Sequence, residues 1–506
     1  MRKKLIVFFF IFIVLITNLG RMRMYGGSCS FYTFFGLGCY FIYFPAIIVG
    51  YEEFRPMDRR KFLAASGVLL HELSRGGWSF DKPFHQPRES SPNIILIIAD
   101  DLGYGDLGSQ GCSDIPTPSI DSLAVNGVRF TDGYATAPVC SPSRAGLMTG
   151  SYQQRFGHEF NPGAKRENQG KFGLPQTKPT IAEYLARAGY ATALIGKWHL
   201  GHEPNYRPID RGFQYFFGFY GGSHSYFYSK NSNERPIWRN EKRIKERHYL
   251  TDAFSREAVR FINSHKKNPL FLCLSYSAVH SPLEAPRDRL FRFAYIKDKK
   301  RRMFAAMLSA VDDGVGEILF NLRRLGIERN TLIFFFSDNG GPTSQTSSSN
   351  FPFRGVKDEL YEGGIRVPLI VQWKSVLQQG KVFEDPVILL DIMPTVLSAA
   401  YLRPFNNIIS EGVNLLPYMC EQINNSPHEA LFWRYGPCSA VRKGEWKLIG
   451  SENAPYLLFN LVQDKEEKYN LALKYPQQVK ELIDLYEKWN LNNIPSRWPN
   501  PKDRPI

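Results

Sequence analysis

The clearest hydrophobic pattern in the chain is a continuous apolar run over residues 93–99, which ends at two aspartates, Asp100 and Asp101. A short run that is rich in β-branched side chains, without polar alternation, is typical of a strand buried on both faces of a sheet. Similar runs predict further strands over 191–195, 270–276, 332–337 and 369–372. Helices are predicted between the strands, over 119–126 and 180–188, and a glycine follows each of them as a stop signal.

Strands that alternate with helices predict the fold class, an α/β sandwich in which a large and mostly parallel sheet lies between layers of helices. In open α/β sheets, ligands bind beyond the carboxyl ends of the strands. Polar side chains follow several of the predicted strands at this edge. They are Asp100, Asp101, Lys197, His280, Asp338 and Asn339. We therefore expect the functional site at the carboxyl edge of the sheet.

The texture of the chain changes at about residue 412, where the hydrophobic runs become shorter and turn residues separate them. They predict strands over 430–434, 439–442, 446–449 and 456–460, and then a helix over 476–489. This pattern indicates a small antiparallel sheet with one packing helix. We therefore divide the folded part of the 506 residues into a main domain, 92–411, and a C-terminal subdomain, 412–506.

The first 91 residues contain three segments that resemble targeting signals, the first of which is a signal-peptide-like run of basic residues at 2–4 and apolar residues at 5–16. Residues 1–56 form a hydrophobic targeting or membrane-anchor region, in which a charge-free stretch over 24–51 is long enough to span a bilayer. Residues 57–91 hold a twin-arginine-like signal that begins at Met57, and then a polar linker. Either two spans anchor the protein in a membrane, or translation starts at Met57. Both alternatives predict an exported body that is periplasmic, extracellular or membrane-anchored.

Composition and charge narrow the possible partners. The chain has 63 basic and 48 acidic residues, a formal charge of +15. A basic surface can attract anionic membranes, acidic polysaccharides or nucleic acid, although a solvated face without a partner is equally consistent with it. We find no nucleic-acid-binding motif and expect no nucleic-acid partner. Seven scattered cysteines without a C-x-x-C pair indicate neither a zinc ribbon nor a disulfide framework.

One of these cysteines, Cys140, lies in a distinctive run, Cys140-Ser141-Pro142-Ser143-Arg144. A free cysteine most often behaves as a small buried hydrophobic side chain. The neighbours of Cys140, however, are turn and helix-start residues, and Pro142 suits the first turn of a helix because its missing N–H needs no partner there. Cys140 is thus predicted at a helix N-terminus, where free amides and the helix dipole favour an anion.

The polar residues at the strand ends suit the chemistry of an anionic ester. Paired Asp and Asn side chains supply the oxygen ligands that Ca²⁺ and Mg²⁺ prefer, although such residues also cap ordinary turns. Lys197 and His199 would project to one side of an extended segment, which places a cation beside a titratable base. Ala278 to Pro282 and Phe353 to Lys357 supply a second histidine, His280, and a second lysine, Lys357.

Taken together, these motifs resemble the type I sulfatases, which depend on formylglycine. The C-x-P-S-R run of Cys140 is similar to the maturation signal of that family, and residues 189–201 resemble its second motif over their whole length. The resemblance covers roughly Pro92 to the C-terminus, and its texture is similar to bacterial arylsulfatase A and N-acetylgalactosamine-6-sulfatase relatives. It implies the alkaline-phosphatase-like fold.

The resemblance also implies a metal site and a modified cysteine. A divalent cation, usually Ca²⁺ with Mg²⁺ as an alternative, would be held by Asp100, Asp101, Asp338 and Asn339. Cys140 would complete this site after oxidation to formylglycine. Such oxidation requires a formylglycine-generating enzyme as a partner in the host.

The catalytic roles carried over from the family fall on six side chains around Cys140. Arg144 and Lys197 would hold the formylglycine hydrate and the sulfate charge. Asp338 would also help to activate the hydrate hydroxyl. His280 and Lys357 would bind the sulfate and protonate the departing alcohol, and His199 would act as the base when sulfate is expelled and the aldehyde is restored.

The substrate and two rival functions stay open at this point. Aromatic and basic side chains in a long insertion could stack on sugars and bind sulfates, or could simply pack: His224, Tyr226, Tyr228, Arg235, Trp238 and Arg239. We expect a sulfated glycan or an aryl sulfate as substrate. The rivals are a phosphatase or phosphodiesterase of the same superfamily, and a non-catalytic, membrane-tethered protein that binds polyanions.

Overall fold

The computed structural model describes residues 91–162, 172–228, 236–402, 410–452 and 454–500, together with the backbone of two short N-terminal strands. These strands, β1 (Phe34–Phe35) and β2 (Gly38–Cys39), pair antiparallel and belong to one unit of the chain, Met1–Lys82. The predicted targeting segments otherwise lie outside the described residues. All that follows concerns the second unit, Pro83–Ile506.

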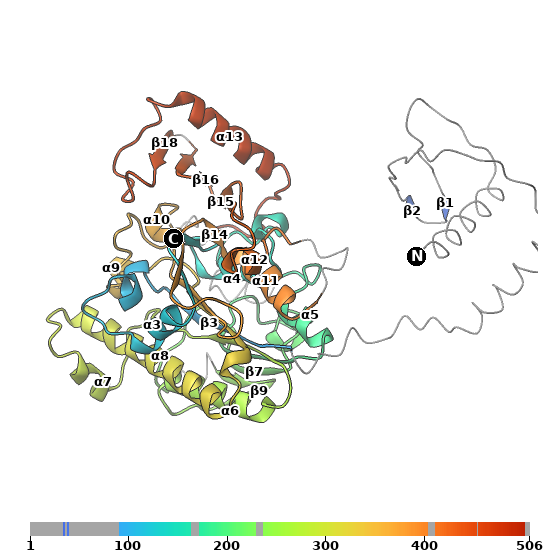
Figure 1. Cartoon of the computed structure of the whole chain (residues 1–506), viewed down its shortest axis with the longest axis vertical. Helices are drawn as coiled ribbons and strands as arrows, with labels where there is room; N and C mark the ends of the chain where they lie inside the picture. The colour runs from blue at the N-terminus through green and yellow to red at the C-terminus, as the bar shows by residue number, and fades with distance from the viewer. Residues whose placement is uncertain are drawn as a thin grey trace, which may run out of the picture. The chain divides into compact units, whose positions relative to one another are not determined.

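A sheet of ten strands lies at the centre of the described part of this unit (Figure 1). The strands are β3 (Asn93–Ala99), β4 (Val128–Phe130), β6 (Ala191–Lys197), β7 (Tyr215–Phe219), β8 (Ile237–Arg239), β9 (Lys242–Ile244), β10 (Leu270–Ser275), β11 (Thr331–Ser337), β12 (Leu369–Gln372) and β13 (Lys381–Phe383). Their order is β13-β4-β12-β11-β3-β10-β6-β7-β8-β9. The five central strands, from β11 to β7, run parallel, whereas β12 and β8 pair antiparallel with their neighbours.

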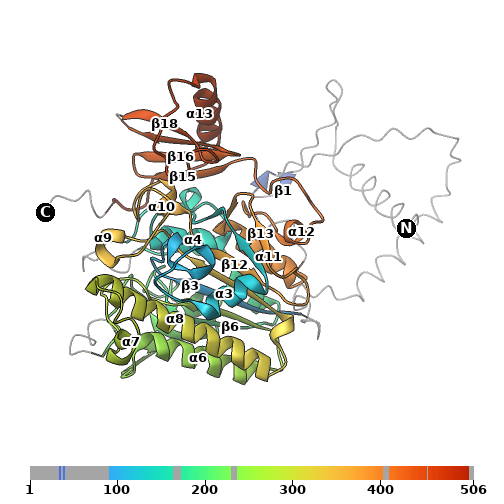
Figure 2. The ribbon, with the colours of Figure 1, turned by 60° about the vertical axis from the view of Figure 1, so that its left-hand side comes forward.

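Helices cover both faces of the sheet. They are α3 (Pro118–Val125), α4 (Cys140–Thr149), α5 (Ile181–Arg187), α6 (Leu250–His265), α7 (Arg287–Arg292), α8 (Lys299–Arg324), α9 (Thr343–Thr346), α10 (Glu362–Ile365), α11 (Ile392–Ala399) and α12 (Leu416–Met419). Figure 2 shows α6 and α8 side by side along one face. The predicted α/β sandwich with a mostly parallel sheet is confirmed.

Each central strand supplies two hydrophobic cores because successive side chains of a strand point to opposite faces. Along β3, Ile95 and Ile97 pack in the core that contains α3, α6 and α8. Ile94, Leu96 and Ile98 pack in the opposite core, with α4, α5 and α11. This burial on both sides explains why the run lacks polar alternation.

The C-terminal part of the chain forms a second, antiparallel sheet, as the sequence predicts. It is a meander of β15 (Leu431–Tyr435), β16 (Cys438–Lys443), β17 (Trp446–Ser451) and β18 (Ala454–Asn460). Helix α13 (Pro476–Asn490) covers one face, where Leu482 packs on Val441 and Leu448. The other face packs on the main domain, and Trp433 donates a hydrogen bond of 2.8 Å from Nε1 to the carbonyl of Ala135.

Membrane spans are predicted only in the N-terminal region, which the structure does not describe beyond β1 and β2. Within the described residues, no helix combines the length and the apolar character that crossing a bilayer requires.

Candidate active site

Four neighbouring parallel strands end at one edge of the sheet and bring the predicted polar residues together there. Asp100 follows β3, and Asp338 follows β11, whose last residue, Ser337, pairs in register with Ala99. Lys197 is the last residue of β6, and His280 lies in the loop after β10. The prediction that the carboxyl edge of the sheet gathers these side chains is confirmed by their mutual contacts.

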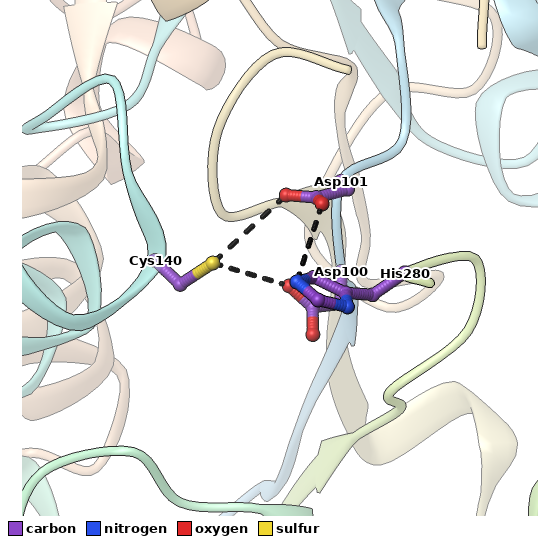
Figure 3. Close-up of side chains that lie close together, drawn as sticks. All are labelled: Asp100, Asp101, Cys140 and His280. Carbon is purple, nitrogen blue, oxygen red and sulfur yellow. Dashed lines mark hydrogen bonds and ion pairs between the residues drawn. The ribbon is translucent and has the colours of Figure 1, made fainter. Parts of the chain in front are cut away.

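Cys140 is the first residue of α4, so the predicted helix N-terminus is also confirmed. Its side chain is buried, and the thiol donates to Asp100 Oδ1 at 3.5 Å and lies 3.9 Å from Asp101 Oδ1 (Figure 3). Nζ of Lys357 lies 3.3 Å from the same sulfur. Burial raises the pKa of the Cys140 thiol, and the lysine charges beside it oppose that shift. An oxygen atom in the position of this sulfur would therefore lie between the carboxylates of Asp100 and Asp101 and the ammonium group of Lys357.

Asp100 and Asp101 are fully buried carboxylates that cations compensate. Lys197 Nζ lies 2.6 Å from Asp100 Oδ2, and Lys357 Nζ lies 2.8 Å from Asp101 Oδ1. Burial alone would raise the pKa of both carboxyl groups, but the charges of these lysines and of His280 outweigh it and lower the pKa below the ordinary range. Both side chains are thus held as anions, the form in which a carboxylate binds a metal ion.

Arg144 binds a third carboxylate, that of Asp338. Its Nε donates to Asp338 Oδ2 at 2.8 Å, and Nη1 donates to Ser275 Oγ at 2.6 Å and to the carbonyl of Lys197 at 3.2 Å. Burial raises the pKa of Asp338, with Arg144 working against it. Because Arg144 lies one helical turn after Cys140, α4 delivers the thiol and the guanidinium to the same point.

The site opens on the side of Lys357 and His280. Their side chains are 12% and 18% exposed, whereas those of Asp100, Asp101 and Lys197 are 0–1% exposed. His280 Nδ1 bonds to the carbonyl of Ser281 at 2.6 Å, which leaves Nε2 to face Asp101 Oδ2 at 3.6 Å. A ligand that enters the site therefore meets these two side chains first.

His199 reaches the site by a different route from the one that the sequence predicts. Strand β6 ends at Lys197, and His199 has a φ of 61°, so Lys197 and His199 do not share one face of an extended segment. The imidazole is buried, and its Nδ1 has no hydrogen-bond partner among the described residues. Burial and the nearby charge of Lys197 lower its pKa well below the ordinary value, so the ring is neutral at neutral pH.

The residues present fit a divalent cation that prefers oxygen ligands. Atoms of Asp100, Asp101, Cys140 and His280 lie within 4.8 Å of one another, so the structure adds His280 to the group of potential ligands. Asn339 Nδ2 donates to Asp101 Oδ1 at 2.7 Å, while its buried Oδ1 has no partner in the described chain. An unpaired buried oxygen beside clustered carboxylates is an arrangement that a hard cation would satisfy.

Sequence reasoning missed several residues that shape the site. Ser275 links Arg144 to the end of β6, and the hydroxyl of Ser141 bonds to His158 Nε2 and to the carbonyl of His199. A Cβ on Gly222 would lie 2.7 Å from two ring atoms of His199. Only the Gly221-Gly222 pair in the sequence signals this close approach, and serine hydroxyls give no signal before the fold is known.

The aromatic insertion packs more than it presents a binding surface. The buried hydroxyl of Tyr226 donates to the carbonyls of Ser277 and His280, at 2.5 and 2.8 Å. Trp238 packs on Tyr220, and Arg239 pairs with a glutamate of α6. Tyr228 is exposed, and Arg235 lies outside the described residues. The insertion therefore supports the loop of His280.

Comparisons with known proteins agree with this geometry. Residues 92–402 match the family model described as Sulfatase. Arylsulfatase J of Mus musculus is 32% identical over 478 residues, which cover 82% of this chain and 78% of that protein. N-acetylgalactosamine-6-sulfatase of Mus musculus is 33% identical over 381 residues, 70% of this chain and 71% of that protein.

Solved structures show the same similarity in three dimensions. The crystal structure of Ps i-CgsB superposes with a TM-score of 0.77 at 37% identity, and the match covers 81% of this chain and 94% of that one. A second structure of that protein, in complex with k-i-k-neocarrahexaose, gives a TM-score of 0.76 with the same identity and coverage.

Proposed function

The chain belongs to the sulfatase family, and from this premise and the geometry of the site we propose how it removes sulfate from an ester. The nucleophile would be a formylglycine made from Cys140, and the carboxylates around it would hold a divalent cation, Ca²⁺ in preference to Mg²⁺. The observation that carries the proposal is the position of Cys140 Sγ, at 3.5 Å from Asp100 and 3.3 Å from Lys357.

The donor set accounts for the cofactors. Asp100, Asp101, Asp338 and Asn339 would hold the cation, and the side chain of residue 140 would complete the site. When both groups are present, the hydrated aldehyde supplies an oxygen nucleophile and the cation withdraws charge from the sulfate oxygens. Hydrolysis of an anionic ester needs this help, because the attacking group approaches a centre that is already negative.

The side chains around Cys140 supply the remaining roles. Arg144 and Lys197 bring positive charge to the buried end of the site, where they hold Asp338 and Asp100 in place. Lys357 and His280 stand at the opening, where the leaving alcohol must lie, and there they bind the sulfate and give the alcohol its proton.

His199 suits the role of a base. Because burial and the charge of Lys197 lower its pKa, the imidazole is neutral at neutral pH and its Nδ1 has no partner among the described residues. It can therefore take a proton in passing, and the same lowered pKa makes it return that proton readily. In this scheme it takes the proton whose removal releases the sulfate and regenerates the aldehyde.

We propose a sulfated glycan as the substrate, with aryl sulfates as a small-molecule alternative. Support comes from the named activity of the N-acetylgalactosamine-6-sulfatases and from the k-i-k-neocarrahexaose that is named in the complex of a protein 37% identical to this chain. A formylglycine-generating enzyme would be the maturing partner. Export, with or without a membrane anchor, is proposed from the N-terminal sequence alone.

The test begins with maturation. We would coexpress the chain with a formylglycine-generating enzyme and analyse the peptide Phe130 to Arg144 by mass spectrometry, with Cys140→Ala as the control. We expect the aldehyde at residue 140 and sulfate release from sulfated glycans or 4-nitrophenyl sulfate. Unmodified thiol without turnover, in a host that matures a control sulfatase, would support a polyanion-binding protein instead. Faster release of phosphate than of sulfate would support the phosphatase alternative.

A further inference from the structure

A large cavity lies beside the site and has no role in the chemistry described above. Its volume is about 1010 Å³, at the upper end of the range for ligand pockets. Its walls are the segments 105–114 and 347–355, the start of α8 and residues 466–468. No residue of the cavity wall belongs to the proposed catalytic set.

The chain segments that form two of these walls are continuous with residues of the catalytic site. Gly105 lines the cavity four residues after Asp101, and Gly355 lines it two residues before Lys357. A chain of two residues spans about 7 Å at most, so the cavity wall begins within that distance of Lys357. Because the site opens on the side of Lys357, a long ligand bound at the site could continue into this cavity.

Positive charge gathers where α8 borders the cavity, at Arg301. Helix α8 begins with Lys299, Lys300, Arg301 and Arg302, although the dipole of a helix N-terminus disfavours positive charge. Arg301 forms ion pairs within the protein, with Asp106 at 2.6 Å and with Asp114 at 2.8 Å.

Two other cations remain available: Arg354 lines the cavity, and Lys300 precedes the lining residue Arg301 and reaches Ser344, the neighbour of the lining residue Thr343. Lys300 donates to the carbonyl of Ser344, and Arg354 donates to the carbonyl of Glu467 and stacks on Tyr361. Neither of them forms an ion pair with a carboxylate in the described part of the chain. The acidic residues of the wall, Asp114 and Glu466, are each paired with a cation.

An exposed aromatic ring lies in the same wall. Phe351 is 74% exposed, on a segment whose other large apolar side chain, Phe353, is buried against Tyr104. Because most of the ring is exposed, it contributes little to packing this loop, and serines 347–349 precede it in the same wall. The electron-rich face of such a ring attracts the C–H groups of a sugar, and the cations attract its sulfates.

We propose that this cavity binds the sulfated sugar residues that flank the ester being cleaved. The chain then acts on a stretch of sulfated polysaccharide and not on an isolated sulfated sugar. Phe351 stacks on a sugar ring, and Lys300 and Arg354 bind its sulfates. The inference rests on the proposed function, and it specifies the length and the charge of the substrate.

Binding is measured separately from turnover, in the Cys140→Ala protein. The probes are k-i-k-neocarrahexaose, a sulfated fucan hexasaccharide and a heparin hexasaccharide, with titration calorimetry as the readout. We expect at least one probe to bind, and its dissociation constant to rise about 3–10-fold with Phe351→Ala and again with Lys300→Ala. Increasing ionic strength should weaken binding less in the Lys300→Ala protein than in its parent.

Matched controls are available on the same molecule. Phe320→Ala removes another exposed ring on α8, roughly 28 Å along the helix from Arg301, and Lys480→Ala removes an exposed lysine of α13. Neither should change binding. If no probe binds, or if Phe351→Ala and Lys300→Ala bind as tightly as the controls, the inference is wrong.

Kinetics of the matured enzyme separate the two proposals. On the oligosaccharide, Phe351→Ala and Lys300→Ala should raise KM with little change in kcat, and on 4-nitrophenyl sulfate they should change neither. If binding follows the expected pattern but no sulfate is released, the proposed function is wrong and the proposal that the cavity binds sulfated sugars stands. If sulfate release from the oligosaccharide is the same in both variants as in the parent, the proposed function stands and the proposal that the cavity binds sulfated sugars is wrong.

Discussion

At the scale of single residues, the position of His199 depends on a neighbour that has no side chain. The left-handed backbone at His199 turns its imidazole into the site, and Gly222 leaves the space that the ring fills. A base must lie within hydrogen-bonding reach of the proton that it takes, so a small displacement of this ring is costly. Gly222 is therefore a positioning residue for His199.

Gly222→Ala should lower kcat without unfolding the protein. The added Cβ would stand 2.7 Å from Cε1 and Nε2 of His199, which must move away from its present position. We expect kcat to fall about 10–100-fold with an unchanged melting temperature. Gly221→Ala is the matched control, since its Cβ meets nothing within 4 Å. Equal activity of the two variants would contradict the role given to Gly222.

The sequence could predict which residues form the site, but not how they are supported. Asp100, Asp338 and Lys197 follow apolar runs that can be read as strand ends, and parallel strands bring their ends to one edge. The left-handed turn at His199 leaves no mark in the hydrophobic pattern, because Trp198 and Leu200 on either side are both buried. The contact of Gly222 with His199 joins distant segments, which only the fold defines.

At the scale of elements, a tyrosine hydroxyl helps to hold the loop after β10 that carries His280. Tyr226, from the insertion between β7 and β8, donates to the carbonyls of Ser277 and His280. The ring stacks on Tyr249, so the hydroxyl is fixed by packing as well as by its partners. The insertion thus serves catalysis indirectly, by holding the loop of His280 at the opening of the site.

Tyr226→Phe should weaken the enzyme more than it weakens the fold. Losing one buried donor to two carbonyls costs about 1–3 kcal/mol of stability, part of which local loosening of the loop absorbs. We expect kcat/KM to fall about 5–20-fold and the melting temperature to fall by a few degrees. Tyr228→Phe, at an exposed position of the same insertion, should change neither quantity. A stable loop with full activity in Tyr226→Phe would contradict this support.

The hydrophobic pattern predicts the strands that are buried on both faces, but it does not predict two helices that pack closely on each other. The central strands β3, β10 and β11 were expected within one residue of their observed ends. Helices α6 and α8 were not among the elements that the hydrophobic pattern predicted. Helix α8 contains Gly314, where a Cβ would clash with Ser255 Oγ of α6. The two helices therefore pack closely because a glycine, which usually indicates a break in a helix, stands inside α8.

At the scale of the whole molecule, the proposed cation would join strands that are distant in the sequence. Its ligands come from the ends of β3 and β11, together with the first residue of α4. Without a cation, like charges on Asp100 and Asp101 meet at this junction, and only lysine, arginine and histidine side chains among the described residues oppose them. Metal binding should therefore stabilise the main domain as well as activate it.

Removal of the cation should lower both activity and stability. After dialysis against EDTA, we expect sulfate release to be lost and the melting temperature to fall, by the equivalent of about 3 kcal/mol for a site that was saturated 100-fold above its Kd. Ca²⁺ should restore both quantities, and Mg²⁺ should restore them less well. If chelation changes neither quantity in protein that elemental analysis shows to be metal-free, the donor set does not hold a cation.

The C-terminal sheet is joined to the loop of Lys357 by buried charges. Lys447 of β17 lies 2.8 Å from Glu362 and 2.9 Å from Glu467, and all three side chains are buried. Glu467 Oε2 also accepts a hydrogen bond from the backbone N–H of Glu362, at the start of α10. Arg366 also pairs with Glu362, at 3.1 Å, whereas Glu467 pairs with Lys447. Burial and the nearby charge of Glu362 outweigh Lys447 and raise the pKa of Glu467 to about 7.

This shift predicts a pH-dependent stability with a definite sign. The folded protein keeps a proton on Glu467 that the unfolded chain releases near pH 4.5, so the stability due to this group is lost as pH rises from about 4.5 through 7. Gln resembles the protonated form and cannot ionise. The advantage of Glu467→Gln over the parent should therefore grow between pH 5 and 8, by about 3 kcal/mol at most, measured as melting temperature. Glu466→Gln, on the exposed side of the same turn, should show no such trend, and a Glu467→Gln curve parallel to that of the parent would mean that the buried carboxyl does not titrate in this range.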